Sequence, residues 1–142
     1  ERVVEALVPR LHDPRDDVKV SAAWGLAVIG AREADLRAPA LCGLAGCLHH
    51  GDPAARSAAL RALLAFKHTA PSVGRSVAAI LHQLDGVPFR CAVAVIARSG
   101  TTDEDVARAL RTAGRHCEDR DRTLIAQALA RVVPGDQAAP TR

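Results

Sequence analysis

Aromatic residues are almost missing from this chain of 142 residues, which has one tryptophan, two phenylalanines and no tyrosine. Its core must therefore consist of Ala, Leu, Val and Ile, whose small side chains let helices pack toward the short end of an interaxial range of about 8–10 Å. Alanine also has the highest intrinsic helix propensity of all residues. The composition therefore favours an all-α fold.

Motifs of catalysis, secretion and membrane insertion are missing as well. No Gly-rich phosphate loop, nucleophile elbow or zinc-protease motif occurs, so we expect no catalytic residue, no metal and no cofactor. No secretory signal occurs, and every apolar stretch of about 18 residues is interrupted by a charge or a helix breaker. We expect a cytoplasmic protein without membrane contact. Because methionine is absent even at position 1, we also expect this chain to begin inside a larger protein or after processing.

The charge of the chain is only mildly basic, with 19 Lys and Arg residues against 16 Asp and Glu residues. A dedicated nucleic-acid-binding domain usually carries a more concentrated positive field. The four cysteines lie within or at the end of apolar helical runs, which is typical of buried thiols rather than disulfide partners. These cysteines are Cys42, Cys47, Cys91 and Cys117.

A basic residue opens an alanine-rich run four times along the chain, at Lys19, Arg56, Arg90 and Arg122. The separations are 37, 34 and 32 residues, and a turn rich in Asp, Gly and Pro precedes each basic residue. Another amphipathic run precedes each turn. Such a period indicates stacked helix pairs, in which one pair cannot bury its apolar face without its neighbours.

Apolar residues at helical spacing predict four antiparallel helix pairs. Their expected bounds are 3–12 and 16–29, 38–49 and 53–67, 73–84 and 88–99, and 103–117 and 121–133. The second helix is expected to stop at Gly30. We expect residues 1–133 to form one α-solenoid, and residues 134–142, which contain two prolines and no periodicity, to form a flexible tail or linker.

The first repeat also carries a family resemblance. Residues 11–26 read Leu-His-Asp-Pro-Arg-Asp-Asp-Val-Lys-Val-Ser-Ala-Ala-Trp-Gly-Leu, and this stretch resembles the HEAT-repeat family, in particular its short bacterial, phycobilisome-lyase-like form. The resemblance covers about residues 2–133 and weakens after the first repeat. It implies a right-handed superhelix within a larger bacterial protein. It further implies that the second helices line the concave, ligand-facing side, and that turn aspartates bind the basic residues of neighbouring repeats.

One helix of the first repeat is apolar on two faces, because Val20, Trp24 and Val28 lie opposite its core residues. The positions equivalent to Trp24 in the later repeats are Arg61, Val95 and Gln127, and Arg131 is equivalent to Val28. One interpretation is a groove that is apolar at Trp24 and polar or cationic at Arg61, Gln127 and Arg131. The alternative is that Trp24 packs on neighbouring helices or on a repeat upstream of this chain.

The row of basic residues at 19, 56, 90 and 122 also has two interpretations. It either donates hydrogen bonds to turn carboxylates and carbonyls or tracks the phosphates of a nucleic acid. Histidines recur near the ends of the first helices of the pairs, at His12, His49, His50, His82 and His116. We expect a protein-interaction or scaffolding module that binds another protein or the rest of its own chain. The alternatives are a nucleic-acid-binding HEAT-like module and a lyase-related accessory domain.

Overall fold

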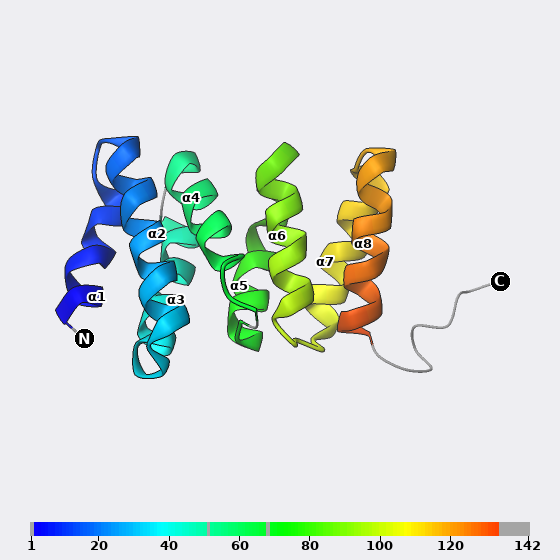
Figure 1. The fold of residues 1–142 in the computed structure, drawn as a ribbon. Helices are drawn as coiled ribbons and strands as arrows, with labels where there is room; N and C mark the ends of the chain where they lie inside the picture. Colours follow the sequence, from blue (N-terminus) through cyan, green and yellow to red (C-terminus); the bar gives the residue numbers. More distant parts are fainter. Residues whose placement is uncertain (1, 51, 68, 134–142) are drawn as a thin grey trace. The chain divides into compact units, whose positions relative to one another are not determined.

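The computed structural model describes residues 2–50, 52–67 and 69–133, and these residues form eight α-helices, two short 3-10 helices and no strand (Figure 1). The predicted all-α class is therefore confirmed. The chain divides into two compact units with the boundary between Thr69 and Ala70. The predicted tail, residues 134–142, lies outside the described residues.

The N-terminal unit contains five helical elements. They are α1 (Arg2–Leu7), the 3-10 helix η1 (Val8–His12), α2 (Asp16–Arg32), α3 (Ala34–His50) and α4 (Pro53–Leu63). Helix α2 packs against η1, α3 and α4. Its buried residue Leu26 belongs to the same core as the buried leucines of these neighbouring helices. The fully buried leucines of this unit are Leu11, Leu26, Leu44, Leu48, Leu60 and Leu63.

The C-terminal unit also contains five helical elements. They are α5 (Pro71–Ile80), the 3-10 helix η2 (Leu81–Gln83), α6 (Gly86–Arg98), α7 (Glu104–His116) and α8 (Asp119–Val132). Helix α6 packs against α5 and α8, while α7 packs against α5, η2 and α8. Val77, Val93, Ile96 and Leu110 form the centre of this core.

The prediction that the second helix stops at Gly30 is wrong, because α2 continues to Arg32. Gly30 provides space for packing rather than a helix end. A Cβ atom at this position would lie 2.9 Å from the Ala40 Cβ atom and 2.9 Å from the Phe66 Cζ atom. The missing side chain therefore lets α3 and the Phe66 ring approach α2 closely.

Two other helix ends differ from the prediction in the same unit. Helix α3 begins at Ala34 instead of residue 38, so that Glu33 alone separates it from α2. The Arg37 Nε atom, 3.3 Å away, donates to the Gly30 carbonyl near the end of α2, which satisfies one of its terminal acceptors. Helix α4 ends at Leu63 instead of residue 67, and tight backbone bonds from Ala65 and Phe66 then turn the chain.

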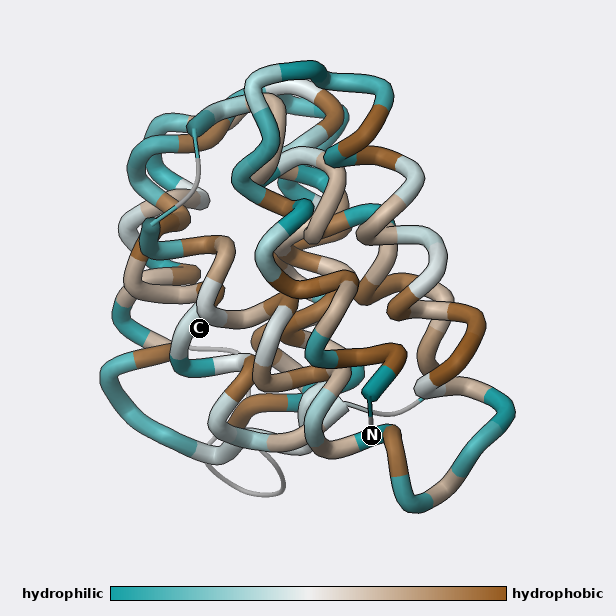
Figure 2. Tube along the Cα trace, turned by 90° about the vertical axis from the view of Figure 1, so that its left-hand side faces the viewer, coloured by the Kyte–Doolittle hydropathy of each residue, from teal (hydrophilic) through white to brown (hydrophobic). Residues whose placement is uncertain are grey.

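The hydropathy of the chain follows this arrangement (Figure 2). Hydrophilic stretches mark many of the bends between helices, and hydrophobic stretches alternate with hydrophilic ones along the helices, as expected for elements that bury one side. Among the described residues, no helix combines the length and the apolar character needed to cross a membrane.

Candidate functional site

An exposed line of apolar side chains runs along α2. Val20, Trp24 and Val28 are 54%, 59% and 36% exposed and lie one helical turn apart on the same side. The opposite side of α2 holds the buried Ala22 and Leu26. Trp24 is therefore not part of the core of its unit, and the helix presents a second apolar face to the outside.

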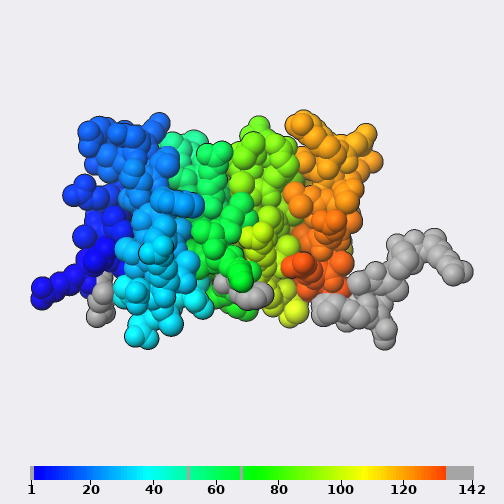
Figure 3. Space-filling model, viewed as in Figure 1, coloured from blue at the N-terminus to red at the C-terminus, as the bar shows by residue number. Residues whose placement is uncertain are grey.

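One side of α4 lies next to this exposed apolar line of α2. A hollow of about 450 Å³ lies along the outer side of the packed helices α2 and α4, and its lining consists of Val20, Trp24, Ala54, Ser57, Ala58, Arg61 and Ala62. Figure 3 shows the two helices next to each other on the viewed face of the N-terminal unit. We call Val20, Trp24, Val28 and Arg61, with the hollow beside them, the α2–α4 face. The structure thus brings Trp24 and Arg61 together, as the repeat alignment predicts.

Helix α4 begins at a capped N-terminus and carries Arg61 near its other end. Asp52 caps this helix by accepting the Ala55 backbone N–H at 2.8 Å, and Pro53 occupies the first helical position. Arg61 lies in the last turn of α4 and is exposed. Among the described residues its guanidinium forms no ion pair, so its charge is open to an outside partner.

The other positions of the predicted groove lie in the C-terminal unit. Val95, which the repeat alignment makes equivalent to Trp24, is fully buried in α6, which packs against both α5 and α8. Gln127 and Arg131 are exposed on α8.

The first member of the basic row, Lys19, is buried between two carboxylates. Its ammonium donates a hydrogen bond to Asp16 at 3.0 Å and another to Asp52. The Asp52 hydrogen bond, followed by that of Asp16, raises the pKa of Lys19 above its ordinary value. In turn, the Lys19 hydrogen bond and the Ala55 N–H hold the pKa of Asp52 below its usual range.

The remaining members of the basic row have different surroundings. Arg90 lies 3.7 Å from Asp121 of α8, while the exposed Arg122 lies 3.3 Å from Asp119 in its own helix. Arg56 is half-buried on α4. The Lys19–Asp52 and Arg90–Asp121 pairs have the same pattern, since each joins the second helix of one pair to the start of the second helix in the next pair.

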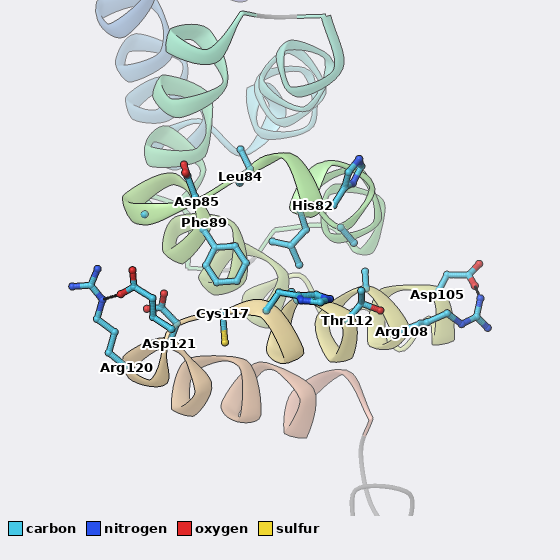
Figure 4. Close-up of a pocket in the computed structure, with 17 residues that line it drawn as sticks. His82, Leu84, Asp85, Phe89, Asp105, Arg108, Thr112, Cys117, Arg120 and Asp121 are labelled. Atoms are coloured by element: carbon cyan, nitrogen blue, oxygen red, sulfur yellow. Dashed lines mark hydrogen bonds and ion pairs between the residues drawn. The ribbon is translucent and has the colours of Figure 1, made fainter.

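A larger hollow in the C-terminal unit was not predicted from the sequence. It has a volume of about 710 Å³ and lies between η2 and the start of α6 on one side and α7 and the start of α8 on the other (Figure 4). His82 and His116 both line it. Their recurrence at helix ends was the only sequence signal that pointed to this region.

The hollow and its surroundings offer no metal centre. Within residues 2–50, 52–67 and 69–133, no three His, Cys, Asp or Glu side chains gather so that they could hold an ion. Of the cysteines, Cys47 is buried, and that burial together with the charge of Asp52 raises the pKa of its thiol; Cys42, in contrast, is exposed.

In comparisons with family models, curated proteins and solved structures, nothing matches this chain.

Proposed function

We propose that this protein is a protein-interaction module and that the α2–α4 face is its contact surface. The observation that carries the proposal is the 59% exposure of Trp24 between two exposed valines. Scattered surface hydrophobes are ordinary, but a contiguous apolar line beside a hollow is typical of an interaction site. Trp and Arg are also the residues that contribute most often to binding energy at interfaces, and this face holds one of each.

The chemistry of this face specifies the partner. Its apolar line runs along α2, and its positive charge is Arg61 on the other side of the hollow. The matching partner is a peptide segment with apolar side chains for Trp24 and Val20 and a carboxylate for Arg61. A bidentate guanidinium–carboxylate pair would fix the orientation of such a segment.

The proposal includes a HEAT-like solenoid as the architecture. Within the N-terminal unit, α1 packs on α3 and α2 on α4; within the C-terminal unit, α5 packs on α7 and α6 on α8. First helices thus contact first helices, and second helices contact second helices, as in stacked pairs. The Lys19–Asp52 and Arg90–Asp121 pairs support the same interpretation. A surface lined by second helices would then be the ligand-facing side.

A display library of random peptides tests the proposed function. Peptides selected on the wild-type protein should be apolar with at least one acidic residue. Their affinity should fall by about 30-fold or more for Trp24→Ser, because truncating a hot-spot residue costs about 2 kcal/mol or more. The matched control uses two valines of nearly equal exposure: Val20→Ser should weaken binding, and Val3→Ser on α1 should not.

The contrary outcomes are equally specific. Peptides that bind Trp24→Ser as tightly as the wild type would place the contact surface elsewhere. Tight binding of a labelled 20-nucleotide RNA or DNA duplex that weakens steeply with salt would favour the nucleic-acid alternative instead. Peptide binding through the α2–α4 face should depend only weakly on salt, since its main contact is apolar.

A further inference from the structure

The hollow of the C-terminal unit has the size and lining of a small-molecule site. Its volume of about 710 Å³ falls within the usual range of about 300–1,000 Å³ for ligand pockets. Leu81 and Phe89 line it on one side and Ala109 and Ala113 of α7 on the other. Figure 4 shows the Phe89 ring extending from α6 into the space above α7. The small alanine side chains opposite the ring leave that space unfilled.

Charged side chains lie at both ends of this apolar centre (Figure 4). At one end, Asp105 and Arg108 neutralise each other at 3.1 Å. The other end is richer in carboxylates, because its lining includes Asp85, Glu118 and Asp121. Arg120 is the one basic residue among the described residues that line this end. Arg120 is already bound to Glu118 at 2.7 Å. This second end therefore favours a positive charge.

Asp121 is the polar group that specifies the ligand. Its side chain is only 8% exposed, and its one charged neighbour, Arg90, lies 3.7 Å away, beyond hydrogen-bond distance. Arg90 does not line the hollow, so it faces Asp121 from another side. Among the described residues, no donor hydrogen-bonds to the Asp121 carboxylate. The carboxylate therefore has an ion pair with Arg90 but no hydrogen bond, and a donor that enters through the hollow would supply one.

We propose that this hollow binds a small amphiphilic amine. The apolar body of the ligand lies between Phe89 and α7, and its ammonium group donates a hydrogen bond to Asp121. The site belongs to the C-terminal unit and uses no residue of the α2–α4 face. The ligand site and the peptide-binding function can therefore fail independently.

Three probes that share one body and differ in the head group test the proposal. They are 4-phenylbutylamine, 4-phenylbutanol and 4-phenylbutyrate, which carry a positive, neutral and negative head at pH 7. Dissociation constants come from titrations followed by the backbone amide resonances of the ¹⁵N-labelled protein. We expect the amine to bind about tenfold more tightly than the alcohol, because a hydrogen bond to a charged group contributes more than a neutral one. The butyrate should bind most weakly.

Three variants assign the selectivity to Asp121. Asp121→Asn keeps the shape of the side chain and should reduce amine affinity to that of the alcohol. Asp119→Asn removes the same charge from an exposed position of the same helix and should change nothing. Ala113→Leu fills the hollow without changing charge, so it should abolish binding of both the amine and the alcohol. This last variant keeps the test decisive even where Asp121→Asn lowers stability.

Several results would overturn the proposal. Equal affinities of the amine and the alcohol would show that no carboxylate selects the head group. Tighter binding of the butyrate would assign the hollow to anions. An identical effect of Asp119→Asn and Asp121→Asn would show that the preference for the amine depends on the overall charge of the protein and not on Asp121. Resonance changes outside residues 78–121, or none at millimolar probe, would mean that the hollow is not a ligand site.

Discussion

The ammonium of Lys19 on α2 and the N–H of Ala55 on α4 bind the two oxygens of one carboxylate, that of Asp52. Asp52 therefore acts both as the N-cap of α4 and as the counter-ion of a buried lysine. Lys19 is only 4% exposed, so its charge depends on Asp52 and Asp16 for compensation. This arrangement fixes the start of α4 relative to α2, and with it the two sides of the α2–α4 face.

Substitutions of Asp52 should separate its two roles. Asp52→Ala removes the cap and the counter-ion, and we expect it to lower the Tm by about 3–6 °C. Asp52→Asn keeps a capping oxygen and should lower the Tm by less. Asp35→Ala is the control, since Asp35 is exposed on α3 and should leave the Tm nearly unchanged. Calorimetry of the three variants checks this; equal Tm values for Asp52→Ala and Asp35→Ala would contradict it.

The same pair predicts a defined pH dependence. Because folding lowers the pKa of Asp52 below its ordinary 3.8, the unfolded chain binds this proton more readily, and stability falls as the pH drops below about 3.8. Folding raises the pKa of Lys19 above 10.5, so that its contribution is lost only as the pH rises beyond that value. Between these limits the contribution of the pair should be constant.

Urea unfolding of the wild type and Asp52→Asn at several pH values measures this effect. The difference in unfolding free energy between the two proteins should be constant at neutral pH and shrink as the pH falls below 3.8. A difference that is independent of pH down to 2 would show that the carboxylate is not stabilised by Lys19.

Two helical glycines should respond to alanine in opposite directions. Gly30→Ala places a Cβ atom 2.9 Å from both Ala40 and the Phe66 ring, and such overpacking costs about 1–3 kcal/mol. Gly46→Ala in α3 has no atom within 4 Å of the new Cβ, so it should stabilise the helix by about 0.5–1 kcal/mol. Urea unfolding curves measure both, and a stabilising Gly30→Ala would refute the packing role of Gly30.

The single tryptophan offers a direct optical test of the α2–α4 face. Because Trp24 is 59% exposed, its emission should be red-shifted and strongly quenched by acrylamide. Trp24→Ala should change the unfolding free energy by no more than about 0.5 kcal/mol. Phe66→Ala provides the contrast, since this ring is 3% exposed and its removal should cost about 3–5 kcal/mol. Blue-shifted, unquenched emission would place Trp24 in a core.

Sequence periodicity predicted the helices well where turns contain strong breakers. Asp52 and Pro53 mark the start of α4 in the sequence and in the structure. Gly30 misled the prediction, because a glycine near the end of an apolar run has the same appearance whether it terminates a helix or admits a neighbouring side chain. Only the position of Phe66, which depends on tertiary packing, separates the two cases.

The two candidate sites differ in how far the sequence reveals them. The α2–α4 face follows from one helix with apolar residues on two sides, and the repeat alignment places Arg61 beside Trp24. The hollow of the C-terminal unit is different. Helical spacing places Ala109 and Ala113 of α7 on the same face as the buried Val106 and Leu110. It contains no information on whether another side chain fills the space opposite these alanines.

The contact of Phe66 with Gly30 has a practical consequence for shortening the chain. Phe66 lies three residues after Leu63, the last residue of α4, yet its ring lies against the Gly30 position on α2. A polypeptide ending at Leu63 would retain every α-helix of the N-terminal unit and still expose the apolar surface around Gly30 and Ala40. An excised N-terminal fragment must therefore extend beyond Phe66 to keep the apolar surface around Gly30 covered.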